Sequence, residues 1–380
     1  MKRLACFVLA LFIGVSLIRA NPSAADSGEK PCIQLALLLD TSNSMDGLID
    51  QARSQLWTVV NHLGKTKKDG QTPRLEVALY EYGNDGLDRR TGWVRQVLPF
   101  TEDLDSVSEK LFALRTNGGE EYCGKVIESC LNELAWSKSP GVYKTIFIAG
   151  NEPFTQGNVD YRTACLAAVG RGVIVNTIHC GSVDQGIAGK WDDGARIGNG
   201  KFLCIDQQKA VVAIVAPQDA DIAKLSAELN KTYVPYGQFG ESSLQRQSLQ
   251  DSFAATAPAA AAAGAPVQRA VSKANAMYKN SKWDLVDAVV NEKTVKLDDV
   301  KDQDLPADLR GKSVQERKDY IDAKAKARGE IQQKINTLNG EREKYVAEKQ
   351  REAGKGDTLD AAMLQAVDEQ LGGKQFDAAK

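Results

Sequence analysis

The residues best suited to chemistry form a short run near the start of the chain, at Asp40, Ser42 and Ser44. They follow the apolar stretch Leu37 to Leu39 and alternate with other residues in a turn-forming segment. A carboxylate and two hydroxyls at this spacing offer hard oxygen donors to one point, which suits Mg²⁺, with Mn²⁺ or Ca²⁺ as alternatives. The other interpretation is a serine-rich turn that caps the following helix.

The segment from Leu37 to Met45 reads LLLDTSNSM, so a D-x-S-x-S motif follows a hydrophobic run and precedes a helical pattern. It resembles the metal-ion-dependent adhesion site (MIDAS) of von Willebrand factor type A (VWA) and integrin I domains. The resemblance implies a VWA fold and a divalent ion that bridges the domain to an acidic group of a partner. It also implies binding, so we expect no enzymatic activity.

A second loop, from Thr116 to Gly124, resembles the glycine-rich turn in which the family places a Thr or an Asp ligand. Here Glu120 falls at that position, and Thr116 is the alternative donor. Glu120 and Glu121 could instead simply favour the N-terminal end of the next helix.

The third loop departs from the family pattern, because Asn151 stands where an Asp is usual, after the apolar run Ile146 to Ala149. A neutral amide oxygen coordinates directly or through water but lowers the negative charge of the site. The carboxylate of Glu120 would offset that loss.

The elements that position these loops are predicted between Cys32 and about Gly237, where short apolar runs alternate with longer amphipathic stretches. This alternation is typical of βαβ units around a buried parallel sheet. Strands are expected at Ile33 to Leu39, Leu75 to Tyr82, Thr145 to Ala149, Val173 to Ile178 and Lys201 to Ile205, with an antiparallel edge strand at Gly92 to Leu98. Helices are expected at Leu48 to Leu63, Leu104 to Leu114, Glu121 to Trp136, Tyr161 to Gly170 and Asp219 to Lys231. The fold class is therefore α/β, a doubly wound, mostly parallel, VWA/Rossmann-like sheet with its site at the carboxyl ends of the strands.

The composition predicts four regions: a signal peptide at 1–20, a VWA domain at 31–240, an Ala/Pro/Ser-rich linker at 241–266 and a charged α-helical region at 267–380. In the last region, Ser313 followed by Glu316 is a capping-box signal, and Gly340 is expected to break the helix. The apolar spacing favours a solvated helix or a helical hairpin over a long coiled coil.

The N-terminus has the pattern of an export signal, with Met1-Lys2-Arg3 followed by an almost uninterrupted apolar run from Leu4 to Ile18. That run is shorter than the roughly 20 residues of a membrane span, which is the competing interpretation. We therefore expect an exported protein, periplasmic or secreted, without a transmembrane span in the mature chain.

Six cysteines follow the predicted signal peptide, and an even number in an oxidising compartment is compatible with disulfides. If Cys123 and Cys130 share a helix, roughly 10 Å separates them, which is too far for a bond. Cys165 and Cys180 are the expected pair, and buried free thiols are the alternative.

The formal net charge of -2 gives no support for nucleic-acid binding. Only two histidines are present, His62 and His179, and a nucleophile pair of His179 with Cys180 is disfavoured because neighbours on a strand point to opposite faces. The expected partner is a protein or envelope component that presents an acidic group. The rival hypotheses are a vestigial metal site in a protein that acts through its C-terminal helices, and an accessory subunit of an envelope enzyme.

Overall fold

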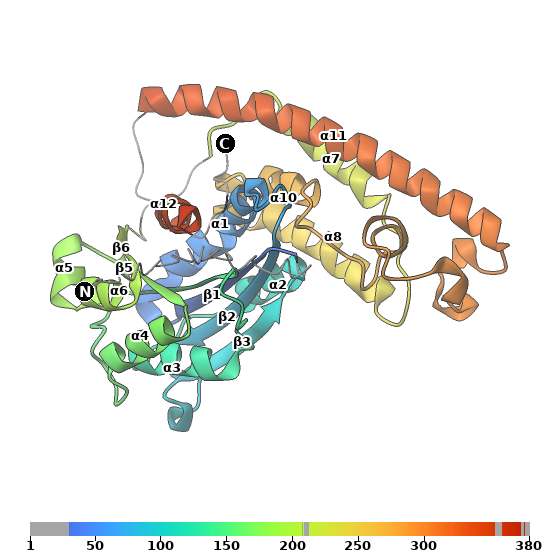
Figure 1. The fold of residues 1–380 in the computed structure, drawn as a ribbon. Coiled ribbons are helices and arrows are strands. Elements are labelled where there is room, and N and C mark those ends of the chain that lie inside the picture. Colours follow the sequence, from blue (N-terminus) through green and yellow to red (C-terminus); the bar gives the residue numbers. More distant parts are fainter. Residues whose placement is uncertain (1–29, 207, 209–212, 354–358, 374–375, 377–380) are drawn as a thin grey trace, which may run out of the picture. The chain divides into compact units, whose positions relative to one another are not determined.

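The computed structural model describes residues 30–206, 208, 213–353, 359–373 and 376. The predicted signal peptide lies outside these residues. The fold is built on a six-stranded sheet in the order β3-β2-β1-β4-β5-β6, in which only β3 is antiparallel (Figure 1). The strands are β1 (Cys32–Asp40), β2 (Arg74–Tyr82), β3 (Val94–Thr101), β4 (Tyr143–Gly150), β5 (Ile174–Cys180) and β6 (Asn199–Ile205). The predicted fold class, including the antiparallel edge strand, is confirmed.

Helices cover both faces of this sheet, as the alternation of the sequence predicts (Figure 1). They are α1 (Asp46–Lys65), α2 (Leu104–Ala113), α3 (Cys123–Glu133), α4 (Tyr161–Gly170), α5 (Val183–Ala188) and α6 (Trp191–Ile197). Successive residues of β1 point to opposite faces. Leu35, Leu37 and Leu39 join the core under α1, whereas Ala36 and Leu38 join the core under α3 and α4. Burial on both faces explains why β1 is apolar at almost every position.

The chain after β6 continues as α7 (Asp219–Asn230), α8 (Gly240–Thr256), α9 (Pro258–Ala262) and α10 (Ala265–Lys273). The predicted linker over 241–266 is therefore wrong, because α8 and α9 fill most of it and bury Gln247, Gln250 and Ala254. Alanine has the highest helix propensity, so an alanine-rich segment becomes helical where it packs. Gly264, at a φ of +75°, makes the turn between α9 and α10.

The C-terminal region is helical, as predicted, and contains α11 (Val314–Ala353) and α12 (Leu359–Gly372). Four short turns precede these two helices: the π-helical turn η3 (Val286–Asn291) and the 3₁₀ turns η4 (Leu297–Asp299), η5 (Asp302–Asp304) and η6 (Ala307–Leu309). Two further 3₁₀ turns, η1 (Asn43–Met45) and η2 (Arg89–Thr91), belong to the sheet domain. The capping box is confirmed, since Glu316 N–H donates to Ser313 Oγ (3.3 Å) and Ser313 N–H donates to Glu316 Oε2 (2.8 Å). The break expected at Gly340 is wrong. One glycine costs a helix only about 1 kcal/mol, and Ile335 and Arg342 on either side of it are buried.

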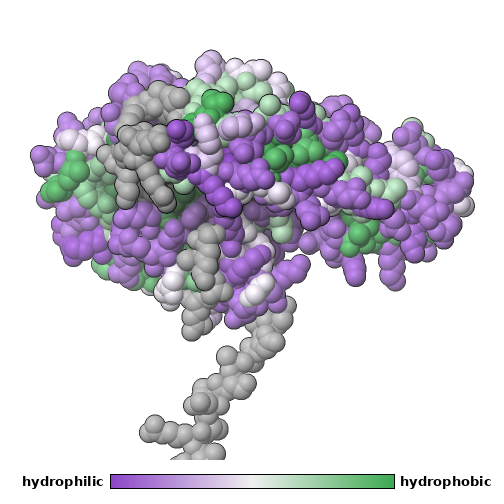
Figure 2. All heavy atoms as spheres, turned by 90° about the horizontal axis from the view of Figure 1, so that it is seen from above, coloured by the Kyte–Doolittle hydropathy of each residue, from purple (hydrophilic) through white to green (hydrophobic). Residues whose placement is uncertain are grey.

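Helix α11 lies against α7 and α10, and its apolar contacts are few for its length. The face of the molecule seen from above in Figure 2 is mostly hydrophilic, with separate small hydrophobic areas. Within the described residues, every helix is either too short or too polar to serve as a membrane span.

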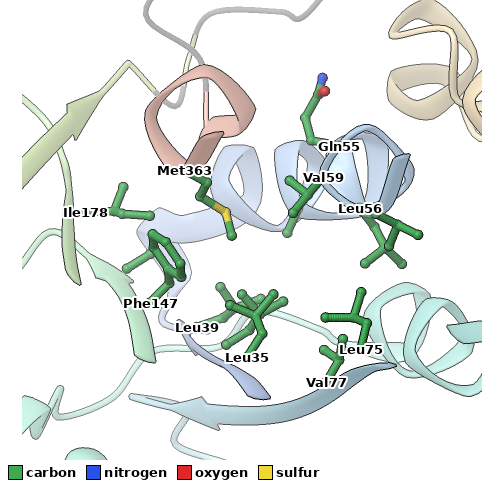
Figure 3. A pocket seen from close by; sticks show the side chains of 14 residues that line it. Leu35, Leu39, Gln55, Leu56, Val59, Leu75, Val77, Phe147, Ile178 and Met363 are labelled. Atoms are coloured by element: carbon green, nitrogen blue, oxygen red, sulfur yellow. The ribbon is translucent and has the colours of Figure 1, made fainter. Parts of the chain in front are cut away.

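Helix α12 packs on α1 and β6, which both precede it by more than 150 positions in the sequence. Its Met363 points between Phe147, Ile178 and Val59 and closes a narrow apolar cavity of about 30 Å³ between α1 and the sheet (Figure 3). Gln370 of α12 accepts a hydrogen bond from the Tyr143 hydroxyl (2.7 Å) and donates one to Asn176 Oδ1 (2.7 Å). The C-terminal helix is thus part of the core on the α1 face of the sheet.

The predicted disulfide between Cys165 and Cys180 is wrong, because both residues are free thiols. Cys165 belongs to the core under α3 and α4, and Cys180 belongs to the core under α1. The sheet therefore separates the two sulfur atoms. Five of the six thiols are buried, which corresponds to the alternative interpretation of thiols in a filled core.

Candidate metal centre

The D-x-S-x-S segment lies at the carboxyl end of β1, where that strand passes into η1 and α1. Asp40 is fully buried, and its Oδ1 accepts a hydrogen bond from the Ser42 N–H (2.8 Å). The Ser42 and Ser44 hydroxyl oxygens lie 3.4 Å apart, and the Asn151 amide lies against Ser44, with Nδ2 3.2 Å from the Ser44 Oγ. Four of the predicted donors are therefore together at one edge of the sheet.

The second carboxylate of the site comes from Glu121, the neighbour of the predicted Glu120. Glu121 is buried, and its pKa is raised to about 8 by burial first, and then by the negative charges of Asp40 and Glu152. A hydrogen bond with the Ser42 side chain acts in the opposite direction. Glu120 is exposed, and it forms no hydrogen bond or ion pair with the other described residues of the site.

Thr116, the alternative donor, is directed elsewhere. Its hydroxyl donates to the carboxylate of Asp46 in the first turn of α1. The loop that carries Thr116 is nevertheless fixed to the metal loop, because the Asn117 N–H donates to the Thr41 carbonyl (3.0 Å). Thr116 therefore lies beside the site, and its hydroxyl is engaged outside the group formed by Asp40, Ser42 and Ser44.

Two glycines allow the backbone to approach Asp40 closely. A Cβ at Gly83 would lie 2.8 Å from Asp40 Oδ1, and Gly83 also adopts a φ of +79°. A Cβ at Gly150 would lie 2.6 Å from the Tyr82 hydroxyl oxygen and 3.0 Å from Asp40 Oδ2. Any side chain at either position would displace the carboxylate.

Asp40 is electrostatically unbalanced. Its pKa is raised to about 7, because burial disfavours the charged form and the charge of Glu152 adds to this effect, while the backbones of Ser42 and Asn151 oppose it. Its Oδ2 is buried and has no hydrogen-bond partner among the described residues. A buried, unpartnered carboxylate oxygen is costly in the absence of a cation.

These residues fit a hard divalent cation. The described residues contain no cluster of three or more His, Cys, Asp or Glu side chains arranged to hold a metal. An ion here would therefore rely on hydroxyl, amide and water oxygens as well as on carboxylates. That mixture is typical of Mg²⁺, which retains several waters and takes few protein carboxylates. The unpartnered Asp40 Oδ2 supplies the required negative oxygen.

The histidines lie outside this centre. His62 Nε2 lies 2.6 Å from Asp368 Oδ1 on α12. The ring of His179 is tilted by 52° against that of Trp191, with the centroids 5.7 Å apart, and Trp191 belongs to the core under α3 and α4. Cys180 lies in the core on the other face of the sheet. The two neighbours therefore point apart, as expected for a strand.

The strand order changes direction between β1 and β4, and Asp40 and Asn151 lie at the carboxyl ends of these two strands. In doubly wound α/β domains, ligands bind at such a switch point. Residues 34–186 match the family described as the von Willebrand factor type A domain. The chain therefore contains a VWA domain, and this class of domain mediates protein interactions.

Several solved structures are similar to part of this chain at low sequence identity. BatB from Bacteroides thetaiotaomicron, a conserved hypothetical protein, is 16% identical over 46% of this chain and 90% of its own, with a TM-score of 0.36. An aerotolerance-related membrane protein from Bacteroides fragilis is 18% identical over 46% and 92%, with a TM-score of 0.31. The SpRpn10 VWA domain is 12% identical over 46% and 88%, with a TM-score of 0.35. With TM-scores below 0.5, these likenesses say nothing about the function of this chain. A comparison with curated proteins gave no match.

Proposed function

We propose that this protein binds a protein partner, or another acidic component of the cell envelope, through a divalent ion held at the carboxyl end of its sheet. The observation that carries the proposal is the buried Oδ2 of Asp40, which has no hydrogen-bond partner among the described residues and has Glu121 beside it. The VWA domain supports a role in protein interaction.

In this proposal Asp40, Ser42 and Ser44 hold the ion, which is Mg²⁺ or, as substitutes, Mn²⁺ or Ca²⁺. Asn151 contributes through its amide oxygen or through water, and Glu121 supplies the second negative charge close by. When bound, the ion supplies an open coordination position for a carboxylate of the partner. Glu121 takes the charge-balancing role that the sequence assigns to Glu120.

We also propose that the protein is exported and acts without catalysis. The apolar N-terminal run supports export, and the separation of His179 from Cys180 supports the absence of a nucleophile pair. The site then serves as a docking point whose affinity depends on the metal.

The test is isothermal titration of Mg²⁺ and Mn²⁺ into the metal-stripped protein, residues 21–380. Binding in the wild type, its loss in Asp40→Ala and its persistence in Asp184→Ala, an exposed acid of α5, is the expected result. Absence of binding to both ions in the wild type would overturn the proposal. It would favour a vestigial site in a protein that makes its contacts through the C-terminal helices.

A further inference from the structure

A cleft of about 720 Å³ opens beside the metal centre, between the first turns of α1, the end of α2 and the junction of α8 with α9. One wall comes from the VWA domain, and the other comes from the segment that follows it. The residues that line it include Asp46, Phe112, Leu114, Arg115, Phe253 and Pro258.

The cleft is continuous with the metal loop. Asp46, which lines it, is the second residue after Ser44, and it accepts the hydrogen bond of Thr116, which also lines it. A partner residue that reaches the ion therefore places the adjoining part of its chain near the mouth of the cleft.

The floor of the cleft is aromatic and only partly covered. The rings of Phe112 and Phe253 lie with their centroids 5.2 Å apart, and both side chains are half-buried. Leu114 is buried behind them, and Pro258 is exposed at the edge. An apolar side chain entering here would remove more of this aromatic surface from water, and aromatic contacts of this kind favour binding.

The rim carries a cation that is available to an acidic ligand. Arg115 is exposed, and its Nη1 donates to the backbone carbonyls of Phe112 and Leu114. Within the described part of the chain, no carboxylate forms an ion pair with it. By contrast, Arg53 of the same cleft is already paired with Asp50. Asp46 also lines the cleft, so Arg115 offers its positive charge to an acidic group that lies away from Asp46.

We propose that this cleft binds the part of the partner chain that flanks the metal-bridging carboxylate. The occupant is an acidic peptide segment in which an aromatic or branched aliphatic side chain, close to the bridging Asp or Glu, packs against Phe112 and Phe253, while a further acidic group meets Arg115. This proposal rests on the metal-dependent binding proposed above. It assigns partner selectivity to α8 and α9, outside the residues that match the VWA family.

The test starts with selection of random displayed dodecapeptides on the immobilised protein, residues 21–380, in Mg²⁺. The enriched peptides are then made synthetically, and their affinities are measured by fluorescence polarisation with Mg²⁺ or with EDTA. We expect enrichment of Asp or Glu near Phe, Leu or Ile. Phe253→Ala should weaken these peptides at least about tenfold, and Arg115→Ala should weaken them a few-fold. Phe239→Ala is the matched control, because Phe239 is an exposed phenylalanine adjoining the same helix but outside the cleft.

A peptide in which the apolar residue is replaced by Ala should bind wild type and Phe253→Ala equally. Mg²⁺ titration into Phe253→Ala should match the wild type, which separates the cleft from the metal centre. Three results would overturn the proposed role of the cleft. They are enriched peptides without an apolar preference, equal binding of the peptides by Phe253→Ala and wild type, and no enrichment at all while Mg²⁺ still binds. Apolar peptides could instead bind wild type with the same affinity in EDTA as in Mg²⁺ and still lose affinity in Phe253→Ala. That result would support peptide binding in the cleft and would overturn the metal-dependent function.

Discussion

Two of the regions in which this protein buries charged side chains balance that charge in different ways. Under α10, Arg269 and Lys273 are almost wholly buried. The Arg269 Nη1 lies 2.7 Å from Asp105 Oδ1, and the Lys273 Nζ lies 2.8 Å from Asp251 Oδ2. The second oxygen of Asp105 accepts from the Tyr278 hydroxyl (2.6 Å). In this group, which we call the Arg269 cluster, each buried charge has a partner of opposite sign.

The pKa shifts of Arg269 and Asp251 follow from that pairing, whereas burial holds the pKa of Lys273 below its ordinary value despite the pairing with Asp251. Burial is the largest single influence on Arg269 and lowers its pKa, but Asp105, Tyr278 and Asp251 together outweigh burial and raise it. Burial would raise the pKa of Asp251, but Lys273 and Arg269 lower it. At the metal centre the opposite holds, because burial and like charges together raise the pKa values of Asp40 and Glu121. The buried charges of the Arg269 cluster are paired with opposite charges, whereas Asp40 and Glu121 form no ion pair with a cation among the described residues.

Breaking the Arg269 cluster should have the largest effect on stability. Arg269→Met leaves Asp105 buried without its cation, so we expect a loss of about 3–5 kcal/mol in the free energy of unfolding. Urea denaturation monitored by circular dichroism measures it. Arg90→Met, which removes an exposed pair with Asp88, is the control and should leave the unfolding midpoint unchanged. A midpoint for Arg269→Met equal to that of the control would show that the buried ion pairs of Arg269 do not stabilise the fold.

Removing the charge of Asp40 should have the opposite effect on stability, and should raise the free energy of unfolding of the metal-free protein. The folded protein holds a proton on Asp40 up to about pH 7, whereas the ordinary pKa of this group is 3.8. Over that interval the folded state binds more protons than the unfolded state, so the stability contributed by this group falls as the pH rises from about 4 to 7 and then levels off.

In the metal-free protein, Asp40→Asn should therefore be more stable than wild type at pH 8, by roughly 1–3 kcal/mol. The difference should shrink toward pH 4, where Asp40 is protonated in the folded protein. Urea denaturation at several pH values checks this, and added Mg²⁺ should stabilise wild type at pH 8 but not the variant. A variant less stable than wild type at pH 8 without metal would mean that the carboxylate already has a partner.

Much of this centre could be predicted from local pattern alone. The strand before Asp40, the spacing of Ser42 and Ser44 and the turn that carries Asn151 are short-range features, and the structure brings them together as expected. The choice between Glu120 and Glu121 could not be made in the same way. Which of two adjacent glutamates turns inward depends on how the loop after Gly118 and Gly119 packs on Gly83, and that contact is long-range.

The Arg269 cluster was not predictable for the same reason. Arg269 is separated from Asp105 by 164 positions in the chain, and its helix follows a segment whose alanine content is compatible with a linker. A charged residue on a short helix is usually solvated, and only tertiary packing shows that this one is buried. Composition likewise could not show that α8 and α9 pack against the VWA domain.

Glu120 and Glu121 give the sharpest test of whether the buried carboxyl next to Asp40, which unlike the carboxylates of the Arg269 cluster has no opposite charge among the described residues, takes part in binding Mg²⁺. Glu121→Gln removes a buried carboxyl next to Asp40 that becomes a second negative charge when a cation displaces its proton. Mg²⁺ affinity should therefore fall about tenfold, equivalent to about 1.4 kcal/mol. Glu120→Gln changes an exposed side chain one residue away and should leave the affinity within a few-fold of wild type. Isothermal titration of both variants at pH 7.5 measures the difference. Equal losses would mean that long-range charge alone attracts the ion. A loss confined to Glu120→Gln would restore the assignment made from the sequence and would require the loop to rearrange around the metal.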